Sequence, residues 1–245
     1  MEKNNFRIGI LGGMGPMTGV FLQKLIIENT PAKIDQDHIE VICFTNPQIP
    51  DRTKSLKEDN GKVFVKSIVE SIKVLEKSDV NCILLPCNTA HARYSEIQNS
   101  TYIPIINMVE LVLSNVRKTG VKNIGVLATD GTIDSGIFET DKSFRVILPN
   151  NDMQSNVMNT IYKIKSGEYD NIEIAEIINT FINDLEKRGA EKIILGCTEL
   201  SLYLSLLKNK NLIDPLIELA KETVKIATNK FDKSKIFVEN KLIIR

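Results

Sequence analysis

The stretch Leu85-Pro86-Cys87-Asn88-Thr89-Ala90-His91 follows an apolar run at residues 80–85, and Ile193-Ile194-Leu195-Gly196-Cys197-Thr198-Glu199-Leu200 repeats its pattern. Each pattern predicts a short buried strand, then a turn that carries a cysteine, then polar residues that begin a helix. A strand that leads into a helix through a functional turn is typical of α/β proteins with parallel sheets. The two cysteine turns are therefore expected to occupy equivalent places in the fold.

These turns belong to a longer internal repeat. Asn123-Ile124-Gly125-Val126-Leu127 parallels Arg7-Ile8-Gly9-Ile10-Leu11, and each segment is followed at a similar interval by a strand that ends in a cysteine. We therefore predict two pseudo-symmetric α/β domains with mainly parallel sheets, one formed by residues 1–103 with 213–245 and the other by residues 104–212. Ligands of open α/β sheets bind at the carboxyl ends of the strands, so the active site is expected in the cleft between the domains.

The composition excludes several classes of protein. The 245 residues include 31 basic and 31 acidic side chains, so the basic footprint of a nucleic-acid-binding protein is missing. No apolar run reaches the roughly 20 residues of a membrane-spanning helix, and residues 1–7 lack the apolar region of a secretory signal. We expect a cytoplasmic protein that binds neither nucleic acid nor membrane.

The cysteines and histidines do not form a recognisable disulfide or metal pattern. The four cysteines contain no Cys-x-x-Cys pair, and with only two histidines a zinc site would need an unusual ligand set, so no metal is expected. Cys43 and Cys82 lie inside apolar strands, where a free cysteine is usually packing.

A glycine-rich turn, Gly12-Gly13-Met14-Gly15-Pro16, follows the first predicted strand at residues 6–11 and precedes a helix at residues 19–28. The dinucleotide fingerprint fails here, because Thr18 stands where the third glycine should be. We expect instead a tight turn whose backbone approaches a small anionic ligand at a helix N-terminus.

Other elements follow from hydrophobic periodicity. Strands are predicted at residues 39–44, 103–106 and 143–148, helices at 61–77, 90–97, 108–118, 153–165, 172–188 and 214–228, and a further strand or hairpin at 235–244. Residues 45–53 contain two prolines and are predicted to form a loop. Arg52 in this loop is either a carboxylate clamp or, more simply, a solvated surface side chain.

The two matched cysteines are suited to proton transfer at the two faces of one carbon atom. A helix N-terminus lowers the pKa of a thiol, and Asn88, Thr89 and Thr198 offer caps and hydrogen bonds beside Cys87 and Cys197. One thiolate and one thiol on opposite sides of a carbon atom would move a proton from one face to the other. A nucleophilic cysteine would need a paired histidine; His91 is available, although a structural hydrogen-bonding role is the simpler interpretation.

Five segments together resemble the cofactor-independent aspartate/glutamate racemase family, and within it the aspartate racemases. They are Gly9-Ile10-Leu11-Gly12-Gly13-Met14-Gly15-Pro16, Asn46-Pro47-Gln48-Ile49-Pro50-Asp51-Arg52-Thr53, Pro86-Cys87-Asn88-Thr89-Ala90-His91, Leu127-Ala128-Thr129-Asp130-Gly131-Thr132 and Leu195-Gly196-Cys197-Thr198-Glu199. Relatives closer to glutamate racemase usually carry Cys-Thr-His at the second cysteine. Cys-Thr-Glu in this chain points to the branch that acts on aspartate or on acidic amino acids more broadly.

The resemblance implies a racemase that interconverts L- and D-aspartate, or glutamate, as a homodimer and without pyridoxal phosphate or another cofactor. It makes Cys87 and Cys197 the acid/base pair. It also implies a set of substrate-binding residues, comprising Asn88, Thr89 and Ala90 for the α-carboxylate, Arg52 for the side-chain carboxylate, Lys165 (with Lys163 as the alternative) in a similar part, and Thr132 and Thr198.

Three other functions remain open at this point. One is an isomerase or decarboxylase on the same fold that uses the cysteines asymmetrically. Another is an amino-acid-binding protein, although such a protein has no need of two matched thiols. The third is a thiol redox enzyme, which would oxidise its cysteines to a disulfide. The racemase hypothesis predicts closure of the domains on the substrate, with hinges near residues 102–103 and 212–213.

Overall fold

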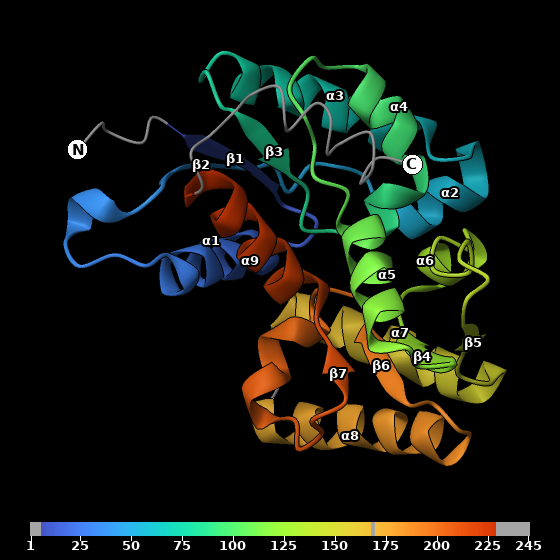
Figure 1. The fold of residues 1–245 in the computed structure, drawn as a ribbon. Coiled ribbons are helices and arrows are strands. Elements are labelled where there is room, and N and C mark those ends of the chain that lie inside the picture. The colour runs from blue at the N-terminus through green and yellow to red at the C-terminus, as the bar shows by residue number, and fades with distance from the viewer. Residues whose placement is uncertain (1–5, 168–169, 229–245) are drawn as a thin grey trace.

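The computed structural model describes residues 6–167 and 170–228, and it contains two parallel sheets (Figure 1). The first sheet has the order β2-β1-β3 and the second the order β5-β4-β6-β7. Their strands are β1 (Arg7–Gly12), β2 (Glu40–Thr45), β3 (Cys82–Leu84), β4 (Asn123–Leu127), β5 (Arg145–Ile147), β6 (Lys192–Leu195) and β7 (Leu212–Ile213). In both sheets the first strand lies between the second and the third, and the predicted α/β class with parallel sheets is confirmed.

Helices fill most of the connections between strands, as parallel pairing requires. The α-helices are α1 (Pro16–Asn29), α2 (Arg52–Asp59), α3 (Lys62–Glu76), α4 (Tyr94–Asn99), α5 (Met108–Thr119), α6 (Asp130–Asp134), α7 (Asn151–Ser166), α8 (Asn171–Lys187) and α9 (Pro215–Thr228). Short 3₁₀ helices are η1 (Asp35–Asp37), η2 (Thr89–Arg93) and η3 (Leu200–Leu206). Among the described residues, no helix combines the length and apolar character needed to cross a membrane.

Local sequence explains where the longer helices begin and end. The side chain of Asn107 accepts the backbone N–H of Glu110 at the start of α5, and Gly120 ends that helix with a left-handed φ of 73°. The side chain of Asn150 caps α7 in the same way, and Gly167 ends it with a φ of 74°. Polar caps and terminal glycines therefore set these boundaries, and tertiary packing of the apolar faces stabilises the helices between them.

Each sheet is covered on both faces. Helices α1 and α9 pack on one face of the first sheet and α3 on the other, whereas α7 and α8 cover one face of the second sheet and α5 the other (Figure 1). Because both faces are buried, the strands are almost continuously apolar. The two sheets meet where α5 packs against α9, and the carboxyl ends of β3 and β6 both lead into the loops that carry the cysteines.

The structure differs from the predicted elements in several places. Residues 103–106 make only a single bridge, between Ile83 and Ile105, because Pro104 has no N–H with which to continue a ladder. Arg52 is not in a loop but is the first residue of α2, whose N-cap Asp51 accepts the backbone N–H of Lys54. The polar stretches after the cysteines begin as 3₁₀ turns, and α6 was not predicted. The strand or hairpin predicted at 235–244 lies outside the described residues.

Candidate active site

Cys87 and Cys197 line the same small cavity. Its walls come from both cysteine loops, from the N-terminus of α2 with Arg52, and from the face of α7 that carries Lys165. The space between these side chains is about 10 Å3, which is no more than one water-sized sphere occupies. Both cysteines are buried, so the thiols face a nearly closed cavity. Neither cysteine forms a disulfide.

A buried histidine holds the Cys87 loop in place. His91 Nδ1 lies 2.9 Å from the carbonyl oxygen of Cys87, and His91 Nε2 accepts the backbone N–H of Met108 at 3.2 Å. An acceptor at Nε2 implies that the proton is on Nδ1, so the neutral imidazole donates to Cys87 O. Burial lowers the pKa of His91 and favours this neutral form. Both ring nitrogens are thus engaged with backbone groups, which gives His91 a positioning role.

Two buried side chains in the cavity wall have polar atoms without a partner among the described residues. They are Asn88, at both its amide nitrogen and its amide oxygen, and Arg52, at Nε. Arg52 is anchored from behind, because its Nη1 donates to the carbonyl oxygens of Ile49 and Pro50. A buried polar atom left unpaired costs about 1–3 kcal/mol. Their grouping around two thiols is best explained by a polar ligand that binds there.

The Cys197 side of the cavity contains a carboxylate. Cys197 Sγ donates to Glu199 Oε2 at 3.0 Å, and Glu199 Oε1 accepts the backbone N–H of Gly15 at 3.0 Å. Lys165 Nζ lies 3.3 Å from the same Oε1. Burial, followed by the charge of Glu199, raises the pKa of the Cys197 thiol well above its ordinary value, and the charge of Lys165 opposes that shift. Burial is the largest single influence on Lys165 and lowers its pKa, but the charges of Glu199, Cys197 and Cys87 together outweigh burial and raise the pKa of this lysine.

Hydroxyl groups connect the loops of the two sheets across the cavity. Thr198 Oγ1 donates to the carbonyl oxygen of Pro86 at 3.0 Å. On the other side, Thr89 Oγ1 lies 3.0 Å from Thr129 Oγ1 and 2.8 Å from Thr132 Oγ1, and these two hydroxyls are themselves 3.0 Å apart. Each loop is therefore held by hydrogen bonds to the opposite half of the molecule.

The structure brings most of the predicted site residues together. The residues in the cavity wall are Arg52, Cys87, Asn88, Thr89, Lys165, Cys197 and Thr198. Ala90 is fully buried and does not line the cavity, and Thr132 lies behind Thr89 as its hydrogen-bond partner. Lys165, rather than Lys163, lines the cavity of the cysteines, and Lys163 lines a different cavity between α7 and α8.

Sequence reasoning did not assign Glu199, Asp51 or Tyr162 to the site. Glu199 had a usable signal, since a carboxylate two positions after a cysteine in a turn can reach its sulfur. The backbone of the glycine-rich turn was expected to approach an anionic ligand, and in the structure the N–H of Gly15 contacts the carboxylate of Glu199, 184 positions away. Among the described residues, no group of three or more His, Cys, Asp or Glu side chains is arranged to hold a metal ion.

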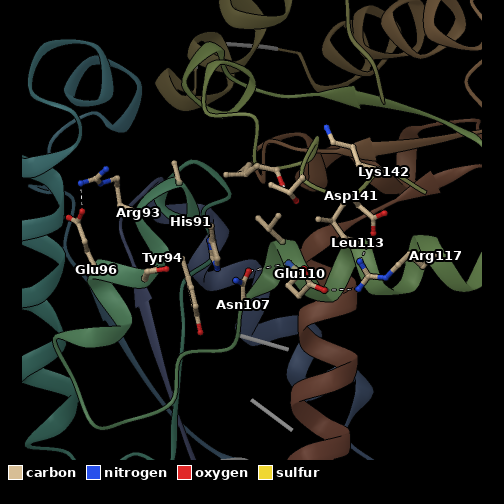
Figure 2. Close-up of a pocket in the computed structure, with 15 residues that line it drawn as sticks. His91, Arg93, Tyr94, Glu96, Asn107, Glu110, Leu113, Arg117, Asp141 and Lys142 are labelled. Atoms are coloured by element: carbon tan, nitrogen blue, oxygen red, sulfur yellow. Dashed lines mark hydrogen bonds and ion pairs between the residues drawn. The ribbon is translucent and has the colours of Figure 1, made fainter. Parts of the chain in front are cut away.

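A larger cavity of about 680 Å3 lies on the far side of His91, between the η2–α4 segment, α5 and the loop around Asp141 (Figure 2). Most of its charged side chains are already paired, Arg93 with Glu96 and Arg117 with both Glu110 and Asp141. The ammonium of Lys142 donates to the carbonyl oxygen of Glu139. Neither of the two matched cysteines lines it. We therefore take the smaller cavity, with its thiols and unpaired polar atoms, as the candidate active site.

Residues 11–227 match the family profile described as Asp/Glu/Hydantoin racemase. The chain belongs to the Asp/Glu/hydantoin racemase family. This racemase chain is 30% identical over 226 residues to the broad specificity amino-acid racemase RacX of Bacillus subtilis (strain 168), a match that covers 89% of this chain and 96% of RacX. A glutamate racemase of Limosilactobacillus reuteri (strain DSM 20016) is 27% identical over 165 residues, which cover 64% of this chain and 61% of that relative.

The fold of this racemase is similar to that of Picrophilus torridus aspartate racemase, with a TM-score of 0.80 and 31% sequence identity over 94% of this chain and 97% of the other. A glutamate racemase isoform, RacE1 of Bacillus anthracis, shares the fold at a TM-score of 0.66 and 22% identity, covering 94% of this chain and 84% of that one. The predicted family, and with it the amino-acid racemase class of enzyme, is confirmed.

Proposed function

We propose that this protein interconverts L- and D-aspartate by proton transfer between Cys87 and Cys197, without pyridoxal phosphate. The observation that carries the proposal is that two buried cysteines, from equivalent loops of two sheets, line one cavity with Arg52 and Asn88. A relative described as an aspartate racemase, 31% identical to this chain, supports aspartate as the substrate. The relative described as a broad specificity amino-acid racemase, 30% identical, supports racemisation of an amino acid.

The reaction needs one deprotonated and one protonated cysteine at the same time. A thiolate removes the α-proton from one face of the substrate, and a thiol on the other side donates its own proton to the opposite face. The first cysteine ends as a thiol and the second as a thiolate, so one proton enters and one leaves the carbon. The carbanion-like transition state is stabilised by donors that are already oriented, in a cavity that excludes water.

The polar groups of the cavity suit a dicarboxylic amino acid. The unpartnered amide of Asn88, with the neighbouring Thr89, is proposed to hold the α-carboxylate. The guanidinium of Arg52 is proposed to bind the side-chain carboxylate, since Arg–carboxylate hydrogen bonds are charge-assisted and specific in geometry. Aspartate is favoured over glutamate because a relative 31% identical to this chain is described as an aspartate racemase.

Substrate entry requires the two halves to separate. The hydrogen bond from Thr198 to Pro86 and that from Gly15 to Glu199 bridge the cavity and would break on opening. We propose domains of residues 1–103 with 213–245 and residues 104–212, with one hinge near residues 102–103. The other hinge is better placed just after Ile213, because Leu212–Ile213 pair with β6 as β7. A homodimer is proposed on the family resemblance.

The test is to incubate the protein in D2O with L-aspartate, L-glutamate, L-alanine and L-lysine separately, without added cofactor. Chirality and deuterium at Cα are followed over time. Racemisation of aspartate with deuterium entering the product supports the proposal. Binding by calorimetry without exchange would instead indicate an amino-acid-binding protein, and release of CO2 a decarboxylase. Racemisation of alanine or lysine at a comparable rate would indicate a broad specificity and would contradict the assignment of aspartate.

A further inference from the structure

Glu199 is the acceptor of the Cys197 thiol. The distance from Cys197 Sγ to Glu199 Oε2 is 3.0 Å, and both side chains are buried. The carboxylate is itself fixed by the N–H of Gly15 and by Lys165, both at the other oxygen, Oε1. Oε2 therefore faces the sulfur as a hydrogen-bond acceptor. A protonated thiol can donate to this oxygen, whereas a thiolate has no proton to donate.

The other charged and titratable groups around Cys197 do not offset this contact. Lys165 on α7 favours a thiolate, but its ammonium pairs with the same carboxylate that accepts the thiol proton. The other ionisable side chains that line the cavity with Glu199 are Arg52 on α2, its neighbour Asp51 at the N-cap of that helix, Tyr162 on α7 and Cys87. Among the described residues no carboxylate is hydrogen-bonded to Cys87, whose loop is held through its backbone by the neutral imidazole of His91.

We propose that Glu199 is a positioning residue that keeps Cys197 protonated in the resting protein, so that Cys87 is the thiolate that begins the reaction of one of the two enantiomers. The inference rests on the proposed two-cysteine reaction, and it assigns the two thiols different starting states. Racemisation needs one thiol and one thiolate, and Glu199 decides which of the two places the negative charge occupies.

The proton balance follows from this assignment. Cys87 takes the α-proton of one enantiomer and becomes a thiol, while Cys197 gives its proton to the other face and becomes a thiolate beside Glu199. After product release, Cys197 regains a proton and Cys87 loses one, both by exchange with water, which restores the resting state. The equilibrium constant of a racemisation is one, so kcat/KM is equal in the two directions whatever Glu199 does. The test must therefore observe the thiols themselves.

The experiment measures initial rates of alkylation by iodoacetamide on the ligand-free protein over a pH series, with each cysteine peptide quantified by mass spectrometry. The two thiols share one cavity, so slow entry of the reagent affects both rates without moving either pH midpoint. In the wild type, Cys87 is expected to react with a lower pH midpoint than Cys197. In Glu199→Gln, the midpoint of Cys197 is expected to fall by about one pH unit or more, the size of shift that a charge within hydrogen-bond distance imposes.

Glu191→Gln is the matched control, because Glu191 accepts hydrogen bonds from the backbone of Lys122 and Asn123, at the opposite end of β4 and β6 from the cysteines. It is expected to leave both midpoints unchanged. A second readout is the pH profile of kcat/KM for aspartate, whose alkaline limb is expected to move to lower pH in Glu199→Gln, since Cys197 then loses its proton sooner.

Two results would overturn the inference. One is a wild-type protein in which Cys197 titrates at or below the pH of Cys87, a comparison that needs no variant and so does not depend on how Glu199→Gln folds. The other is an unchanged Cys197 midpoint in folded Glu199→Gln. Alkylation requires no turnover, so a protein that racemises nothing would refute the proposed function while leaving the order of the two thiols measurable.

Discussion

The Cys87 and Cys197 loops occupy equivalent places in the fold but differ in their surroundings. β3 and β6 each pair in parallel with the first strand of their sheet, and each leads into its cysteine within a few residues. Cys87 is 5% exposed and Cys197 6%, so burial does not distinguish them. The difference is that a neutral imidazole contacts the backbone of Cys87, whereas a carboxylate contacts the sulfur of Cys197. The repeated backbone supplies two matched positions, and the side chains that differ between the two loops, His91 and Glu199, make them chemically unequal.

The two cationic side chains of the cavity, Arg52 and Lys165, also differ in their partners. Arg52, on the side of Cys87, has an unpartnered Nε and donates otherwise to backbone carbonyls. Lys165, on the side of Cys197, pairs with Glu199. Arg52 is thus the cation that is available to bind an anionic ligand, whereas Lys165 already forms an ion pair with Glu199. The following predictions test this comparison.

The largest effect is expected from replacing each cysteine. Cys87→Ser and Cys197→Ser should each reduce racemisation by roughly 10²- to 10⁴-fold, the usual contribution of a positioned acid or base. Each variant keeps one thiol, so each should still exchange the α-proton of a single enantiomer, and the two variants should exchange opposite enantiomers. Chiral chromatography and NMR in D2O measure both quantities. Cys43→Ser serves as the control, and exchange of the same enantiomer by both variants would contradict the two-sided arrangement.

The comparison of the two cations is tested by Arg52→Met. Loss of a charged hydrogen bond of about 1.5–3 kcal/mol predicts a fall of roughly 10- to 100-fold in kcat/KM for aspartate, mainly through KM. Lys57→Met is the matched control, since Lys57 lies on the same helix and pairs with Asp130 at 3.8 Å at a partly exposed site. A change in KM of the same size in both variants would show that a general charge effect, and not a carboxylate contact at Arg52, is responsible.

The support of the Cys87 loop is tested by His91→Phe, which keeps a ring stacked on Tyr94 but leaves Cys87 O and Met108 N–H without partners. The free energy of unfolding should fall by roughly 1–3 kcal/mol, as expected for buried polar groups left unpaired. Urea denaturation at neutral pH measures it. A loss of activity without any loss of stability would instead favour a direct catalytic role for His91.

His91 also predicts a pH dependence of stability. Its pKa is lowered in the folded protein from the ordinary 6.5, so below pH 6.5 the unfolded chain binds a proton that the folded chain does not. The stabilisation is complete above pH 6.5 and is lost as the pH falls toward the folded pKa. Wild-type unfolding free energy should therefore decrease below pH 6.5, and His91→Phe should show a shallower decrease. Equal slopes would contradict the assignment of a buried neutral imidazole.

The smallest effects are expected from the hydroxyls that join the two halves. Thr198→Val removes one hydrogen bond to Pro86 O, and Thr89→Val removes those to Thr129 and Thr132. Each should lower the free energy of unfolding by about 1 kcal/mol, with Thr89→Val the larger because Thr89 has two partners. Denaturation midpoints at fixed m-value measure the difference. A larger loss in Thr198→Val would show that the Cys197 side contributes more to closing the cavity.

Much of the fold and site could be predicted because the determining patterns are local. Apolar runs, polar caps and terminal glycines set strands and helices within a few residues, as at Asn107 and Gly120 for α5. The predicted elements were wrong where a single residue decided the local structure. Asp51 caps a helix that begins at Arg52, where a loop was predicted, and Pro104 interrupts a predicted strand. Of the proposed site residues, those beside the cysteines are recognisable from their motifs, because the functional residues of each turn are neighbours in the sequence.

The sequence by itself determined the α/β class, the repeated strand-and-cysteine pattern and the racemase family. Only the tertiary structure decided that Lys165 rather than Lys163 faces the cavity, that Thr132 supports Thr89 from behind, and that Glu199 joins Cys197 to Gly15 and Lys165. The reason is physical: strand and helix periodicities depend on neighbours a few positions apart. Burial, charge pairing and the resulting pKa of a thiol instead depend on groups that only the packing of two sheets brings within hydrogen-bond distance.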